Sequence, residues 1–202
     1  MKITIIAGKT ASGKSVALEE LCENYGYEKL ITSTTREPRP GEIDGVDYHF
    51  LSREEFLNKV EEGLFLEHAE YNGNMYGSSL DSFKKDFKGN VPAIILEPTG
   101  AKVAYELLKR KGFTPISVYV YESQETCIER VLSRDASEEE KEKRIHKIKN
   151  EERQWDDYMK YDYVTEGGST IEKNCNEIKA FVDNFQPEQR FDKKKRNRLK
   201  PR

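Results

Sequence analysis

Apolar and charged positions alternate along most of the chain in blocks that predict strands and helices in turn. Two short apolar runs rich in isoleucine, at 2–8 and 91–97, are typical of strands buried on both faces. Further strands are expected at 116–121 and 161–166. Helical spacing of apolar residues predicts the helices between them, at 15–26, 53–65, 100–112, 123–134, 137–160 and 171–185. This alternation predicts an α/β fold, with a parallel sheet flanked by helices.

The composition changes this picture little. Among 202 residues, 36% are hydrophobic and 35% are charged, as in an ordinary globular protein. No run approaches the roughly 20 apolar residues of a membrane span, and the first residues turn polar too early for a signal peptide. We therefore expect a cytoplasmic protein with no membrane partner. Cys22, Cys127 and Cys175 are odd in number and lack CxxC spacing, which predicts reduced thiols and no zinc site.

The end of the chain has a different charge pattern. From Asp192 onward, seven Lys or Arg residues stand against a single Asp, and apolar residues are almost absent. Residues 187–202 are therefore predicted to form a basic, disordered tail. Such a tail could make weak contacts with nucleic acid, but the interpretation as a solubilising segment is favoured.

A phosphate-binding pattern follows the first predicted strand. Residues 8–15 read GKTASGKS, which fits G-x-x-x-x-G-K-S. The two glycines let the backbone curl so that its amides point at phosphate oxygens, Lys14 can reach the β and γ phosphates, and Ser15 can offer its hydroxyl to Mg²⁺. We expect this P-loop to bind a nucleoside triphosphate through Gly8, Lys9, Thr10, Ala11, Ser12, Gly13, Lys14 and Ser15.

A second anion site is predicted in residues 34–50, TTREPRPGEIDGVDYHF, which end in an expected aromatic strand. Arg36 and Arg39 can form a fork around a second dianionic phosphate, with the Tyr48 hydroxyl as a further donor. The prolines beside Arg39 stiffen the loop, so that little conformational entropy is lost on binding. Residues 63–79, GLFLEHAEYNGNMYGSS, add a carboxylate, a tyrosine and paired serines in a Gly-rich frame.

In this order and spacing, the segments 8–15, 33–50 and 63–79 resemble guanylate kinase, over residues 2 to about 185. The resemblance implies a P-loop kinase that transfers the γ-phosphoryl group of ATP to GMP or dGMP with Mg²⁺, and we expect a monomer or a weak dimer. It divides residues 1–186 into a core, a subdomain that binds the nucleoside monophosphate, and a lid. The expected bounds are 1–31, 89–124 and 158–186 for the core, 32–88 for the subdomain and 125–157 for the lid.

Carried over by position, the resemblance assigns the GMP phosphate to Arg36, Arg39, Tyr48 and Tyr76. It implies that Glu67 accepts the N1 and N2 hydrogens of guanine, a pair of donors that adenine does not offer. Thr32 and Ser78 would contact the base, chiefly its O6. The complete expected GMP-binding set is Thr32, Ser33, Arg36, Arg39, Tyr48, Glu67, Tyr76, Ser78 and Glu97.

Arginines in the predicted lid have two interpretations. By themselves, Arg130 and Arg134, one helical turn apart on a charged helix, are more typical of a solvated face. The resemblance instead implies that Arg130 contacts ATP and that Arg134 and Arg144 embrace the phosphates when the lid closes. Phosphoryl transfer needs alignment and charge neutralisation rather than a protein nucleophile. The expected catalytic residues are Lys14, Arg39, Arg134 and Arg144.

Two segments depart from the family pattern. Where the family carries two carboxylates after a core strand, this chain has Ile95 and Glu97, so we expect guanine recognition to rest mainly on Glu67 and to tolerate hypoxanthine. Where the family shows Val-Asn-Asp beside the adenine, this chain has YDYVTEGGS at 161–169. Two alternatives stay open: a kinase for another nucleoside monophosphate, and a non-catalytic guanylate-kinase-like binding module, which the intact P-loop argues against.

Overall fold

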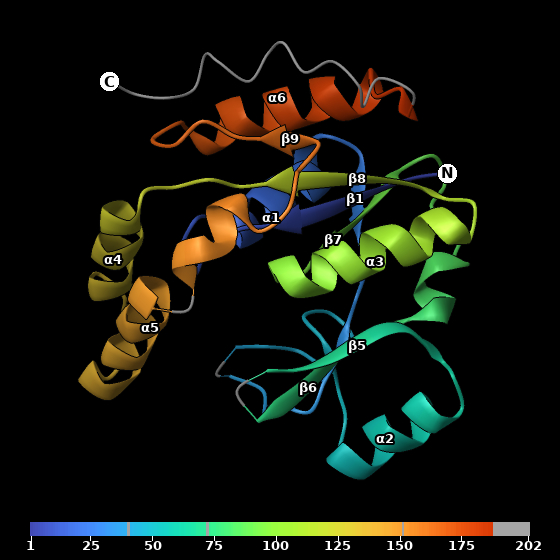
Figure 1. Ribbon diagram of the computed structural model, residues 1–202, viewed down its shortest axis with the longest axis horizontal. Coiled ribbons are helices and arrows are strands. Elements are labelled where there is room, and N and C mark those ends of the chain that lie inside the picture. The colour runs from blue at the N-terminus through green and yellow to red at the C-terminus, as the bar shows by residue number, and fades with distance from the viewer. Residues whose placement is uncertain (40, 72, 151, 188–202) are drawn as a thin grey trace.

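The computed structural model describes residues 1–39, 41–71, 73–150 and 152–187, so the predicted basic tail lies almost wholly outside the described residues. Its core is a five-stranded parallel sheet in the order β2-β7-β1-β8-β9 (Figure 1). The strands of this sheet are β1 (Lys2–Ala7), β2 (Tyr27–Lys29), β7 (Val91–Ile95), β8 (Thr114–Tyr119) and β9 (Tyr163–Val164). The predicted α/β fold with a helix-flanked parallel sheet is therefore confirmed.

Helices cover both faces of this sheet. Helices α1 (Lys14–Asn24) and α6 (Ile171–Asp183) lie on one face, and α3 (Pro98–Arg110) lies on the other (Figure 1). Alternating residues of β1 enter the two halves of the core. Ile5 packs into the cluster on the α3 side, Ile6 packs into the cluster on the α1–α6 side, and both are fully buried. Burial on both faces is why the first strand is apolar without interruption.

A second sheet lies beyond α3, and the sequence indicated only its aromatic strand (Figure 1). It has the order β4-β3-β6-β5. Its elements are β3 (Ser33–Thr34), β4 (His49–Phe50), β5 (Phe65–Tyr71) and β6 (Asn74–Ser79), and the flanking helices are α2 (Arg53–Glu61) and the 3₁₀ helix η1 (Leu80–Phe83). Phe56 of α2 stacks on Phe65 at a ring-centroid distance of 4.5 Å. A Cβ at Gly77 would lie 2.9 Å from the Phe56 ring, so glycine allows α2 to pack on this sheet.

Two further helices project from one side of the core, α4 (Gln124–Leu132) and α5 (Glu138–Asn150) (Figure 1). Cys127, Val131 and Ile148 are fully buried between them. The 3₁₀ helix η2 (Glu152–Asp157) leads back to the sheet, and its Trp155 packs into the cluster on the α3 side. None of the helices in the described ranges is long and apolar enough to span a membrane.

Several predicted boundaries were wrong. The helix predicted at 53–65 ends at Glu61, because Gly63 turns the chain with φ of 67° and Phe65 begins β5. The helix predicted at 137–160 ends at Asn150, and η2 follows, because Trp155 is drawn into the core. The helix predicted at 123–134 ends at Leu132, so Arg130 and Arg134 do not share a helical turn. The last predicted strand is reduced to Tyr163 and Val164.

Candidate functional site

The P-loop joins β1 to α1, in the strand–loop–helix context that its pattern requires. Gly13 is the N-cap of α1 and has φ of 99°, which favours glycine. Gly8 is required by close approach, since a Cβ there would lie 2.6 Å from both Ser12 Oγ and the Val120 carbonyl oxygen. The amides at the start of α1 carry the positive end of the helix dipole. Together these features suit an anion held by the loop backbone.

Lys14 lies within a cluster of four charges beside the loop. Its Nζ donates a 2.9 Å hydrogen bond across the loop to the Lys9 carbonyl. Burial lowers the pKa of Lys14, while Glu152 raises it, Lys147 lowers it further and Glu97 raises it again. Lys14 is half-buried, so its ammonium group is partly shielded from water and lies among fixed charges, which strengthens its attraction for a phosphate oxygen.

Residues from η2 hold the early part of the P-loop. The fully buried Glu152 accepts hydrogen bonds of 2.7 Å from both the amide and the hydroxyl of Thr10. Asp156 pairs with Lys9 at 2.5 Å and accepts a bond of 2.8 Å from the Tyr119 hydroxyl. Sequence reasoning missed both carboxylates, because a continuous charged helix would have placed them on a solvated face. No local pattern marks them.

Arg130 reaches the same loop from α4. Its Nη1 donates to the Ala11 carbonyl at 3.1 Å and to the Ser12 carbonyl at 3.3 Å, and its Nη2 pairs with Glu122 at 2.9 Å. The side chain thus lies at the predicted donor site, where it binds the loop backbone and a buried carboxylate. Contact with ATP itself stays a prediction.

The expected base-reading residues meet on one face of the second sheet. Glu67 is only 7% exposed, and its Oε1 accepts a 2.5 Å bond from the Ser78 hydroxyl. Tyr76 lies two residues before Ser78 on β6 and therefore on the same face. A Cβ at Gly100 would lie 3.6 Å from Glu67 Oε2, so the carboxylate faces the start of α3. Burial raises the pKa of Glu67, and the hydrogen bonds from Ser78 lower it.

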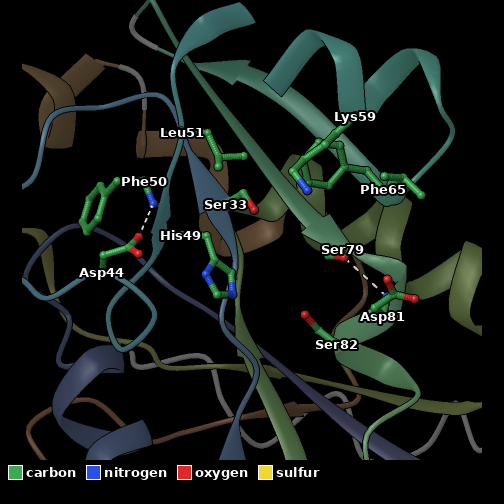
Figure 2. Close-up of a pocket in the computed structure, with 11 residues that line it drawn as sticks. Ser33, Asp44, His49, Phe50, Leu51, Lys59, Phe65, Ser79, Asp81 and Ser82 are labelled. Atoms are coloured by element: carbon green, nitrogen blue, oxygen red, sulfur yellow. Dashed lines mark hydrogen bonds between the residues drawn. The ribbon is translucent and has the colours of Figure 1, made fainter. Parts of the chain in front are cut away.

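Ser33 is separated from these residues. It pairs with Gly77 and His49, whereas Thr34 pairs with Tyr76, so alternation along β3 points Ser33 to the opposite face. There it lines an open cavity of about 310 Å³ together with His49 and Ser79 (Figure 2). Thr32 directly precedes β3, and its carbonyl accepts a 2.8 Å bond from the His49 amide. The structure brings Tyr76, Ser78 and Glu67 together and leaves Ser33 out.

The two arginines predicted to bind a phosphate, Arg36 and Arg39, already have hydrogen-bond partners within their own loop. Arg36 Nη2 donates to both carboxylate oxygens of Glu42, at 2.8 and 2.9 Å, and the Arg36 guanidinium carbon lies 5.5 Å from the centroid of the Tyr48 ring. The Arg39 amide donates to the same Glu42 carboxylate at 2.7 Å, while the Arg39 residue is exposed. Burial raises the pKa of Tyr48, whose ring meets that of Tyr76 edge-on at 6.3 Å. Glu42 therefore orders the loop around Arg36.

The three arginines expected to be catalytic in the loop and the lid all act electrostatically on one carboxylate, that of Glu140. Burial lowers the pKa of Arg134, and the like charges of Arg144 and then Arg39 lower it further. Glu140 of α5 opposes them and pairs with Arg144 at 2.5 Å. The pKa of Glu140 is lowered mainly by this bond, with smaller contributions from Arg39 and Arg134. One carboxylate thus stands among three guanidinium groups, and the excess positive charge suits a polyanionic ligand.

Ile95 and Glu97 lie where the family pattern changes. Ile95 packs toward the α1–α6 core, whereas Ile94 and Leu96 pack toward α3. Because Glu67 faces α3, Ile95 points away from it, and the expected tolerance of hypoxanthine stays a prediction. Glu97 is the N-cap residue of α3, and its Oε1 lies 3.2 Å from Lys147 Nζ. Burial raises the pKa of Glu97 and Lys147 lowers it, so Glu97 belongs to the charge cluster at the P-loop.

The residues at the loop fit Mg²⁺ only as part of a nucleotide complex. Ser15 is exposed on the first turn of α1. Among the described residues, no group of three or more His, Cys, Asp or Glu side chains is placed to hold a metal ion. Mg²⁺ commonly takes one or two protein ligands and completes its shell with phosphate oxygens and water. The hydroxyl of Ser15 suits that arrangement.

Comparisons with known proteins agree with this geometry. A family model described as guanylate kinase matches residues 1–185. A guanylate kinase of Bacillus anthracis is 33% identical over 187 residues, which cover 89% of this chain and 86% of that protein. One of Clostridium perfringens (strain 13 / Type A) is 34% identical over 139 residues, which cover 57% of this chain but only 64% of that relative's length. The crystal structure of guanylate kinase from Anaplasma phagocytophilum matches 93% of this chain and 87% of its own, with a TM-score of 0.66 and 26% identity.

Proposed function

This chain belongs to the guanylate kinase family, and we propose that it transfers the γ-phosphoryl group of ATP to GMP or dGMP, giving ADP and GDP or dGDP. The observation that carries the proposal is the position of Glu140, which pairs with Arg144 at 2.5 Å and has its pKa lowered by Arg134 and by Arg39 of the acceptor loop as well. Cations from the acceptor loop and from the lid suit a group that passes between two bound nucleotides, because charge develops between donor and acceptor.

We infer that the P-loop is the donor site. Its backbone amides and Lys14 would hold the β and γ phosphates of ATP, with the helix dipole of α1 aligned behind them. Mg²⁺, held by Ser15 and the phosphates, would neutralise charge on the transferring group. The partial burial of Lys14 supports this role, because a partly desolvated ammonium interacts more strongly with phosphate than an exposed one.

The acceptor site would be the face of the second sheet that carries Glu67 and Ser78. An ionised Glu67 can accept two hydrogens from a guanine edge, and Ser78 holds one of its oxygens in place. Arg36, Arg39, Tyr48 and Tyr76 would bind the phosphate of the acceptor, and the fork would point the acceptor oxygen at ATP. Adenine would leave the buried carboxylate facing an acceptor nitrogen, which explains the expected selectivity.

In the proposed mechanism, no side chain acts as a nucleophile. Arg39, Arg134 and Arg144 would spread the negative charge of the transition state over three guanidinium groups, while closure of α4 and α5 would keep water from the transferring group. In this arrangement Glu140 has to give up part of its pairing with Arg144 when phosphate arrives.

The proposal can be tested by following ADP release from ATP–Mg²⁺ with GMP, dGMP, IMP, AMP, CMP and UMP as acceptors. We expect GMP and dGMP to be the best acceptors. Glu67→Gln should remove most of the preference, whereas Glu70→Gln is a matched control on the same strand, because Glu70 pairs with Arg53 at the surface.

Two results would contradict the proposal and would identify its replacement. Binding of GMP without ADP release from any acceptor would indicate a non-catalytic binding module. Faster turnover of another nucleoside monophosphate than of GMP would indicate a kinase with a different acceptor.

A further inference from the structure

Glu152 is a buried carboxylate that the transfer chemistry does not use. It is 0% exposed, and both of its oxygens are engaged. Oε2 accepts the Thr10 amide, and Oε1 accepts the Thr10 hydroxyl and lies 3.2 Å from Lys147 Nζ. Burying a carboxylate is costly unless it is paired and hydrogen-bonded. These partners lie in the P-loop and near the end of α5. The free energy of burying the carboxylate is therefore offset only when both segments contact Glu152.

The contacts surround a strained position. Ala11 has φ of 62°, a left-handed conformation in which an alanine is strained and a glycine is not. Glu152 fixes the residue before it through the Thr10 amide, and Arg130 of α4 binds the Ala11 carbonyl itself. Strained residues persist when their surroundings over-determine them. The turn at Ala11 is therefore maintained from outside the loop.

The same contacts connect the P-loop to the helix that carries Arg144. Lys147 lies one turn after Arg144 on α5 and pairs with Glu152 and with Glu97, both at 3.2 Å. Asp156, also on η2, pairs with Lys9. A displacement of α5 would separate Lys147 from Glu152 and leave a buried carboxylate with one partner fewer.

We propose that Glu152 is a positioning residue, which holds the P-loop in the conformation that accepts the triphosphate and makes that conformation depend on the position of α5. The inference rests on the proposed donor role of the P-loop. Glu152 touches no reacting atom in this scheme. Its carboxylate acts through the Thr10 backbone and Lys147, so that the donor site is fully ordered only when the arginine-bearing helix is docked.

The test is Glu152→Gln, with Glu177→Gln as the matched control. Glu177 also accepts a hydrogen bond from a hydroxyl, that of Tyr163 at 2.8 Å, and lies 4.0 Å from Lys173, but it is on α6. Affinity for ATP–Mg²⁺ is measured by calorimetry without acceptor, and KM for each substrate is measured in the transfer assay. We expect Glu152→Gln to weaken ATP binding about tenfold and to leave KM for GMP within about twofold, with no change in Glu177→Gln.

Rescue separates positioning from a general loss of stability. Ala11→Gly removes the strain at the turn, so in the Glu152→Gln background it should recover at least half of the lost ATP affinity on a logarithmic scale. Because relief of this strain also stabilises the fold, calorimetry is run at a temperature at which thermal melts show every variant to be fully folded, and there a protein that is merely less stable has no affinity to recover. If Glu152→Gln does not fold, Thr10→Val removes only the hydroxyl donor and should weaken ATP binding about threefold.

An unchanged ATP affinity in Glu152→Gln, an equal loss for GMP, or no rescue by Ala11→Gly would each overturn the proposal. So would an unchanged affinity in Thr10→Val, if that is the variant measured. Loss of ATP binding in Glu152→Gln, together with a wild type that fails to phosphorylate GMP, would leave the positioning role intact and contradict the proposed acceptor instead.

Discussion

The proposed donor and acceptor sites of this protein are held together in different ways. At the P-loop, the charged side chains from other segments are paired: Glu152 with Thr10 and Lys147, Asp156 with Lys9, and Arg130 with Glu122 and the loop carbonyls. In the proposed acceptor loop, Arg36 is paired with Glu42, whereas Arg39 acts on the Glu140 carboxylate together with Arg134 and Arg144 of the predicted lid.

This difference separates two ways of preparing a site for phosphate. The donor loop is ordered in advance by partners that a ligand does not displace, so binding there costs little reorganisation. The arginines around Glu140 repel one another until an anion arrives, so part of the binding energy of the acceptor phosphate is used to draw them together. The first arrangement favours a preformed donor site, and the second favours closure that depends on substrate.

The largest effect on activity is expected at Lys14, which can be replaced without loss of folding stability. Lys14→Met should lower kcat by about 10²–10³-fold or more, because it removes a cation from the transferring phosphate. Burial lowers the pKa of Lys14, so the charged form opposes folding at neutral pH, and the Met variant should unfold at no lower temperature than wild type. Kinetics and a thermal melt check both. Lys102→Met, at the surface of α3, is the control, and near-normal turnover of Lys14→Met would contradict the P-loop assignment.

On the acceptor side, Glu67→Gln should lower kcat/KM for GMP by about 10²-fold, since the amide offers guanine one acceptor and one donor in place of two acceptors. Burial raises the pKa of Glu67, so the folded protein binds a proton there at a pH at which the unfolded chain has lost it. Stability from this group therefore falls as pH rises from the ordinary glutamate range through the raised pKa, and it stays low above that pKa. The Gln variant should be the more stable protein at neutral pH.

The same shift predicts a pH profile. In wild type, kcat/KM for GMP should decline as pH falls through the raised pKa of Glu67, because the protonated carboxyl can no longer accept both hydrogens. Glu67→Gln should lack this limb, and Glu70→Gln should retain it. A limb of equal position in all three proteins would assign the titration to another group.

Arg36 and Arg39 allow a paired and an exposed arginine to be compared within one loop. Each alanine variant should raise KM for GMP by roughly 10–150-fold, the equivalent of about 1.5–3 kcal/mol for a charge-assisted contact. Only Arg36→Ala should also lower the melting temperature, because it removes the nitrogen that donates to both oxygens of Glu42. ATP affinity measured alone is the control for both. A loss of ATP affinity with unchanged KM for GMP would place this loop on the donor side.

The smallest effect concerns repulsion among the arginines. Sulfate should raise the melting temperature of wild type by about 1 °C more than that of Arg134→Ala, because an anion relieves like charges that the variant no longer brings together. Chloride at the same ionic strength is the control for screening. Equal stabilisation of both proteins by sulfate would show that the three guanidinium groups are too far apart in solution to share an anion.

Patterns in the amino-acid sequence were enough to predict two phosphate sites and, correctly, the class of fold. The P-loop is written in eight consecutive residues, and the loop with Arg36 and Arg39 in seventeen, so short-range spacing is enough to identify them. The isoleucine-rich runs predicted buried parallel strands for the same reason, since burial on both faces leaves no polar positions.

The tertiary structure alone decided which side chains meet. Ser33 lies on the reverse face of its sheet because pairing with Gly77 fixes the register, and Ile95 points to α1 and α6 because its strand alternates there. The sequence predicted Glu152 on the solvated face of a charged helix. In the structure it lies in η2 and contacts Thr10 of the P-loop. Thr10 and Glu152 are 142 positions apart in the sequence. Contacts of this kind depend on how sheets and helices pack, a property of the whole core that no local pattern records.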